Sequence, residues 1–143
     1  MEAHEVLKWE SDTVEARLNG SSGTSIKLSP AHLRLTNQYI RVSTRHHTYT
    51  VAGRGDRNFT EVRIPLLAAK PHRFIQPWFG PYKWETAVQA PLSIEPADDQ
   101  WTLTLTFSSG GAFEYRTTFL KAFGEASQAA SEGIDEVLPA YEP

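Results

Sequence analysis

Cysteine is absent from the 143 residues, and no apolar run approaches the length of a membrane span. Without cysteine the chain has no disulfide, no thiolate metal ligand and no cysteine nucleophile, so its folded state depends on packing and hydrogen bonds. A membrane-spanning helix needs about 20 mainly apolar residues, and the first residues lack the basic and apolar regions of a signal peptide. We therefore expect a soluble, intracellular protein without redox chemistry.

Recognised catalytic and metal-binding motifs are also lacking. None of the five histidines lies in a nucleophile elbow or an HExxH sequence. His46 and His47 are adjacent, so on a strand they would point to opposite faces and could not easily chelate one metal together. Residues 53–55 are glycine-rich but lack the strand-to-helix setting and the lysine of a phosphate-binding loop. We predict no catalytic residue, no metal and no cofactor.

The composition is otherwise that of one folded domain. Hydrophobic residues make up 40% of the chain, with four Trp and seven Phe, which is enough apolar surface to build a core. A chain of 143 residues is too short for two ordinary domains.

Alternating apolar and polar residues predict a mainly β fold in the first half of the chain. The alternation is clear over residues 13–18 and again over 24–29, with a Gly-Ser turn between them, and Pro30 is expected to end the second strand. Residues 32–43 predict either a strand pair or one bent strand. Residues 44–60 are polar and basic and predict an exposed loop, in which Tyr49 to Val51 could pair with a strand.

The second half continues with strands and ends in a helix. Residues 62–84 hold too many prolines for a helix and predict strand and turn. Residues 101–107 alternate strictly, and Ser108 to Gly111 are expected to turn the chain into a second strand over 112–115. From about 116 to 131 the apolar spacing changes to three and four, which predicts a helix with Phe119, Leu120 and Phe123 laid over the open end of the sheet. The whole pattern predicts a β-sandwich or barrel capped by one C-terminal helix.

Several stretches match a known family. Residues 23–35 follow its early pattern G-T-x-x-L-T-P-x-R, although two extra residues delay the arginine to Arg34. Residues 64–67, Phe79-Gly80 and the sequence from Leu105 to Tyr115 match as well. On these residues the chain resembles the WW-domain-binding protein 2 family over positions 20–131. The resemblance implies a GRAM domain over residues 1–131, with the pleckstrin-homology-like fold of two near-orthogonal sheets capped by a helix.

Members of that family are cytoplasmic and nuclear adaptors with transcription coactivator activity, and their long proline-rich tails bind WW domains through PPxY motifs. Residues 132–143 form a short acidic tail instead, in which Leu138, Pro139 and Tyr141 define an LPxY variant of that motif. The resemblance therefore implies a WW-domain partner such as a ubiquitin ligase, and indirect chromatin association without direct nucleic acid binding. Proline pre-extends such a segment and tyrosine supplies an aromatic anchor. The alternative is that Leu138 and Tyr141 fold back onto the domain.

The uneven charge suggests a second hypothesis. The net charge is −3, yet residues 34–83 carry nine Lys or Arg against two acids. If these cations share a face, the domain could bind phosphoinositides or another anionic membrane surface; if strands scatter them over opposite faces, no patch forms. The candidate lipid-binding residues are Arg34, Arg41, Arg45, Arg54 and Arg57.

An aromatic cluster remains open to two interpretations. Trp78, Phe79, Tyr82 and Trp84 lie close together among prolines and could form a recognition surface. A small two-sheet domain also needs bulky residues inside, so core packing is the favoured interpretation. A small-ligand carrier or enzyme is a third hypothesis, which would require an internal cavity with converging polar groups. The sequence offers no support for it.

Overall fold

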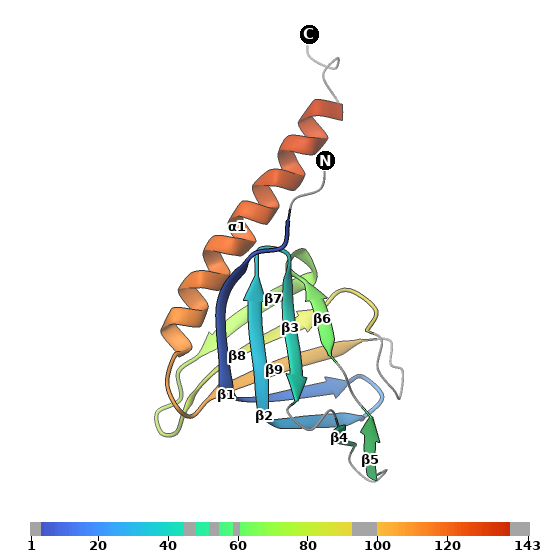
Figure 1. The fold of residues 1–143 in the computed structure, drawn as a ribbon, viewed down its shortest axis with the longest axis vertical. Helices are drawn as coiled ribbons and strands as arrows, with labels where there is room; N and C mark the ends of the chain where they lie inside the picture. Colours follow the sequence, from blue (N-terminus) through green and yellow to red (C-terminus); the bar gives the residue numbers. More distant parts are fainter. Residues whose placement is uncertain (1–3, 45–47, 52–54, 59–60, 93–99, 138–143) are drawn as a thin grey trace.

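The computed structural model describes residues 4–44, 48–51, 55–58, 61–92 and 100–137, and for residues 48–51, 55–58 and 132–137 it describes the backbone only. Within these ranges the chain forms nine strands, one 3-10 helix and one α-helix (Figure 1). Their bounds are β1 Leu7–Gly20, β2 Ser25–Thr36, β3 Tyr39–Thr44, β4 Thr48–Val51, β5 Gly55–Asn58, β6 Val62–Pro65, η1 Leu66–Ala68, β7 Ala69–Ile75, β8 Tyr82–Val88, β9 Trp101–Phe107 and α1 Ala112–Val137.

The strands form one curled, antiparallel half-barrel with α1 packed against it (Figure 1). Seven strands follow each other in the order β6, β3, β2, β1, β9, β8, β7. The other two, β4 and β5, form a hairpin that pairs with β2 at Ile26 and Lys27. The predicted fold class, mainly β with one C-terminal helix, is confirmed. The stretch 44–60, expected to be an exposed loop, contains this hairpin. The sequence pattern allows for a strand only at residues 49–51.

The half-barrel depends on the bend in β1. Its second half, from Glu15 to Gly20, pairs with β9 on one side and with β2 on the other. The β1–β2 register shifts on both sides of Val14, where both strands turn a corner. Pro30 lies in this irregular part of β2, where its missing N–H removes no regular ladder bond. The expectation that Pro30 ends the strand is therefore wrong, and β2 continues to Thr36.

Alternate residues of the strands point into a single core. Strand β9 shows this most plainly, because Trp101, Leu103, Leu105 and Phe107 are buried while the threonines between them are partly exposed. Trp84, only 1% exposed, fills the space under α1 and stacks edge-on with Tyr115 and Phe119. The alternation of apolar and polar residues in β9 therefore corresponds to its buried and exposed faces.

The strand expected over 112–115 is wrong, because α1 already begins at Ala112. A hairpin partner for β9 would need a free strand edge, but β1 and β8 occupy both edges. Gly110 and Gly111 have φ angles of +90° and +92° and turn the chain off the sheet. The helix then starts with the Tyr115 N–H donating to the Gly111 carbonyl at 2.9 Å.

The buried face of α1 is also rotated from the expected one. Ala112, Tyr115, Phe119 and Ala122 are buried at spacings of three and four, and Phe123 packs beside them. Leu120, which the sequence placed on this face, is 44% exposed. The helix is also longer than the expected 116–131, since it runs on to Val137. Among the described residues, no helix combines the length and the apolar character that crossing a bilayer requires.

The adjacent residues Phe119 and Leu120 give a direct test of this helix orientation. We expect Phe119→Ala to lower the free energy of unfolding by about 3–5 kcal/mol, because it leaves a cavity beneath the helix. Leu120→Ala should cost less than about 1 kcal/mol, because the side chain is largely in water. Urea unfolding followed by tryptophan fluorescence measures both values. Equal losses in the two variants would contradict the orientation.

Candidate functional site

Three arginines lie side by side on the outer face of the half-barrel. Arg34 on β2 pairs in register with Arg41 on β3, and Arg41 pairs with Arg63 on β6. Their strand neighbours are buried in the core, so these alternate positions face outward. Like charges directly opposite each other destabilise a sheet unless something compensates them.

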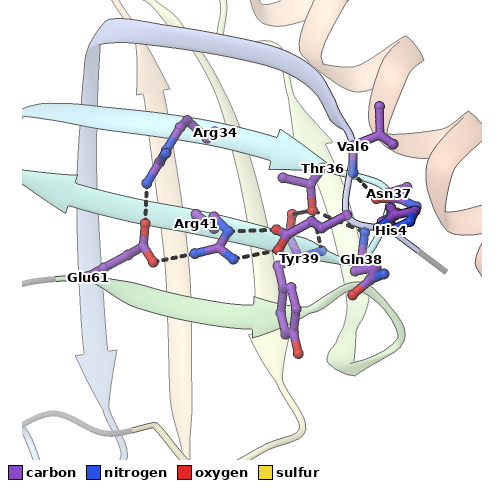
Figure 2. A network of polar contacts seen from close by, with 10 residues as sticks. His4, Val6, Arg34, Thr36, Asn37, Gln38, Tyr39, Arg41 and Glu61 are labelled. Atoms are coloured by element: carbon purple, nitrogen blue, oxygen red, sulfur yellow. Dashed lines mark hydrogen bonds and ion pairs between the residues drawn. The ribbon is translucent and has the colours of Figure 1, made fainter. Parts of the chain in front are cut away.

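Two glutamates supply that compensation (Figure 2). Glu61 bridges two arginines: its Oε1 accepts from Arg41 Nη1 at 2.6 Å, and its Oε2 accepts from Arg34 Nη2. Glu5, from the segment before β1, binds Arg41 with both oxygens, at 2.6 Å from Nε and 2.5 Å from Nη2. We call these five residues the arginine–glutamate cluster: Arg34, Arg41, Arg63, Glu5 and Glu61.

The charged forms of the cluster stabilise one another. The hydrogen bond from Arg41 lowers the pKa of Glu5 from 4.5 to about 2, and the same contact raises the pKa of Arg41. Two guanidinium groups contact the Tyr39 ring, with the Cζ atoms of Arg41 and Arg63 each 5.6 Å from the ring centre. Such cation–π contacts add to the ion pairs.

Asn37 holds the segment that carries Glu5. Its side-chain oxygen accepts from the Val6 N–H at 2.6 Å, and its side-chain nitrogen donates to the His4 carbonyl at 3.0 Å. The backbone N–H of Asn37 donates to the Val6 carbonyl at 3.0 Å (Figure 2). These bonds place Glu5 beside Arg41, so the cluster joins the N-terminal segment to the sheet.

The cluster bears directly on the basic residues expected to bind anionic lipid. Arg34 and Arg41 do share one face, but both are ion-paired with glutamates. Arg57 belongs to β5, where only the backbone is described. Arg45 and Arg54 lie outside the described residues. So do Leu138, Pro139 and Tyr141 of the LPxY motif.

Sequence reasoning missed the partners of these arginines. Glu5 and Glu61 are 36 and 20 residues from Arg41 in the chain. The β3–β6 register brings Glu61 to Arg41, and the Asn37 hydrogen bonds bring Glu5, so no local sequence pattern encodes either contact. The sequence did hold one signal. The basic stretch 34–83 contains a single glutamate, Glu61, and an acid among so many cations is expected to form an ion pair with one of them.

A groove lies between α1 and the η1 segment. It encloses about 470 Å³ and is mainly apolar, with Leu66, Leu67, Ala122 and Ala126 in its walls. Asn37, also in its wall, is already bonded to the N-terminal segment. Across the described part of the chain, no three His, Asp or Glu side chains gather as metal ligands.

The aromatic cluster of the sequence divides in two. Trp84 is buried and Tyr82 is partly buried, as the core interpretation requires. Trp78 and Phe79 are 91% and 84% exposed, so for them that interpretation is wrong. They lie in the turn between β7 and β8, beyond the last paired residues Ile75 and Lys83, where no second layer covers them. We call residues 76–81 the aromatic tip.

No protein-family model matches the chain, and no curated protein matches it significantly. The functional proposals below therefore rest on the residues themselves and on the resemblance described above.

The ion pair of Glu5 makes a pH-dependent prediction. Because folding lowers the pKa of this carboxyl from 4.5 to about 2, its stabilisation is complete above pH 4.5 and is lost as the pH falls toward 2. Glu5→Gln should therefore lower the free energy of unfolding by about 1 kcal/mol at pH 7, a value reduced by solvent screening. The difference from the wild type should shrink as the pH falls from 4.5 to 3 in urea titrations.

Glu125→Gln, which removes an exposed carboxylate from α1, is the matched control and should leave the free energy of unfolding at pH 7 close to that of the wild type. Equal stability of the wild type and Glu5→Gln at pH 7 would show that the pair contributes nothing.

Proposed function

We propose that this protein is a non-enzymatic adaptor, in which a pleckstrin-homology-like domain of the GRAM type presents Leu138, Pro139 and Tyr141 to a WW domain. The observation that carries the proposal is the sequence Leu-Pro-Ala-Tyr placed directly after a helix that extends past the half-barrel (Figure 1). A proline-containing ligand must be extended and accessible before a WW domain can hold it.

The strand order supports the finer fold assignment. The bent strand β1 joins one sheet of β1, β2, β3 and β6 to a second sheet of β1, β9, β8 and β7, and a C-terminal helix packs against them. This is the arrangement that a pleckstrin-homology-like fold requires, with the β4–β5 hairpin as an addition between β3 and β6. Residues 64–67 of the resemblance fall at the end of β6 and in η1, and Phe79-Gly80 falls in the aromatic tip.

The helix supports the accessibility of the motif. Among the side chains of α1 that the structure describes, the last partly buried ones are Ala126 and Ser127, and residues 128–131 are exposed. The backbone remains helical to Val137, so the chain reaches the motif at the end of α1 that is far from the β7–β8 turn (Figure 1). Six residues then remain, four of which form the motif.

The resemblance supplies the partner and the place of action. A WW-containing ubiquitin ligase is the proposed partner, in the cytoplasm and the nucleus, with indirect association with chromatin as a coactivator. A single LPxY site should bind weakly, because one short segment offers few contacts to offset the entropy lost on docking.

The alternative function, phosphoinositide binding through the basic segment 34–83, has less support. Two of its five candidate residues, Arg34 and Arg41, would have to break ion pairs with Glu61 and Glu5 before they could bind a phosphate. Because these glutamates neutralise Arg34 and Arg41, this face is not a free cationic surface for a phosphate.

The motif can be tested by calorimetric titration of the full chain against a panel of isolated WW domains. We expect Tyr141→Ala to abolish binding, because it removes the aromatic anchor. Leu138→Pro should lower the dissociation constant by up to about tenfold, because it restores the second proline of PPxY and reduces the entropy lost on docking.

Ala140→Ser changes the variable position of the motif and is the matched control, with unchanged affinity expected. Binding by none of the WW domains, even after Leu138→Pro, would refute the adaptor proposal.

A further inference from the structure

The aromatic tip is a stiff protrusion that presents two large apolar side chains to solvent. Trp78 and Phe79 contact each other edge-on, with ring centres 6.3 Å apart. Pro77 and Pro81 flank them and restrict the backbone, and Gly80 adopts a φ of +94° that favours glycine. A stiff turn loses little conformational entropy when it binds, so its aromatic side chains are already placed for a partner.

The tip is surrounded by small and aromatic residues. The neighbouring turn, residues 108–111, consists of serine and glycine only. Between the two turns lies a hollow of about 400 Å³, with Pro81, Tyr82 and Phe107 in its walls. Phe113, in the first turn of α1, is 50% exposed and contacts Tyr82 with ring centres 5.2 Å apart. The tip, the hollow and Phe113 therefore form one apolar end of the molecule.

Cations border this end. Lys83 is exposed at the start of β8, directly after the tip. Arg116 is exposed on α1, with its guanidinium 5.3 Å from the centre of the Phe74 ring. Arg73 pairs with Glu85 at 2.8 Å, and Glu114 is the exposed acid of the first helical turn. The balance is positive, which suits an anionic surface.

The size of the exposed aromatic surface favours a bilayer over a folded protein. A buried aromatic side chain removes about 150–250 Å² from water, whereas a stable protein interface buries about 800 Å² on each partner. Two side chains on a convex turn fall well short of that area. A bilayer needs no complementary shape, and tryptophan in particular favours the depth of the lipid headgroups.

We propose that Trp78 and Phe79 insert into the interfacial region of a bilayer that contains anionic lipids, with Lys83 and Arg116 at the headgroups. The insertion needs neither the LPxY motif nor the arginine–glutamate cluster. Helix α1 begins at this end and rises about 38 Å over its 26 residues. A domain docked by the tip therefore holds the end of α1 away from the membrane (Figure 1).

The test is flotation of the full chain with vesicles of phosphatidylcholine and 30% phosphatidylserine, compared with vesicles of phosphatidylcholine alone. We expect binding to the anionic vesicles, and at least about tenfold weaker binding of the double variant Trp78→Ala, Phe79→Ala. Both side chains are exposed, so the variant should fold, and its thermal unfolding curve checks this. Leu120→Ala, an equally apolar change on the exposed side of α1, is the control and should bind like the wild type.

A second measurement reports insertion itself. Trp78 should shift its fluorescence to shorter wavelength on binding and should be quenched by lipids brominated near the headgroup. Trp78→Phe should still bind but lose this signal, because the other three tryptophans are buried or partly buried.

The outcomes separate this proposal from the adaptor function. Vesicle binding by Tyr141→Ala at the wild-type level supports a site independent of the WW ligand. No binding to anionic vesicles, or equal binding by the double variant, would overturn the proposal. Self-association that depends on Trp78 and Phe79, without vesicle binding, would also overturn it and assign the tip to a second copy of the chain.

Discussion

The bend in β1 is the constraint on which the rest of the structure depends. One strand pairs with β2 along its length and with β9 along its second half, so both sheets share it and curl around one core. Because β9 is then paired on both sides, the chain after it cannot form a hairpin with β9 and leaves the sheet. It leaves as a helix, whose Tyr115 and Phe119 cover Trp84. The order of elements and the position of α1 both follow from that one strand.

The outer face of the same sheet shows a second constraint, which is electrostatic. The register that buries Leu33, Ile40 and Val42 also sets Arg34 opposite Arg41 and Arg41 opposite Arg63. A change of register would expose the core, so the repulsion has to be offset by other residues. Glu61 directly precedes the adjacent strand β6, while Glu5 comes from the segment before β1. The arginines thus help to fix the N-terminal segment, and a count of basic residues overstates the free positive charge of the domain.

The sequence predicted those features that one element can specify alone. Strict alternation over 101–107 located β9 and its buried face, and the spacing after residue 116 located a helix. The errors arise where other elements decide the outcome. Residues 112–115 follow a Ser-Gly turn, as the second strand of a hairpin would, but both edges of β9 are already paired. Leu120 fits the helical stripe, but the sheet beneath Phe119 sets a different rotation. Trp78 was assigned to the core from its chemistry, because only the length of β7 and β8 shows that it lies beyond them.

Helix α1 begins next to the aromatic tip and ends at Val137, directly before the LPxY motif in the sequence, and this arrangement has an energetic consequence for the two proposals. A single LPxY segment and a two-residue aromatic tip would each bind weakly, because each forms few contacts. Helix α1 packs on the half-barrel through Ala112, Tyr115, Phe119 and Ala122, so its orientation relative to the tip is fixed. If both proposals hold, a partner that is itself at a membrane meets the motif at a raised effective concentration, without any new contact. Flexible attachment of the motif would spread it over a larger volume and reduce this gain. On the two proposals, the packing of α1 on the sheet would therefore contribute to binding as well as to stability.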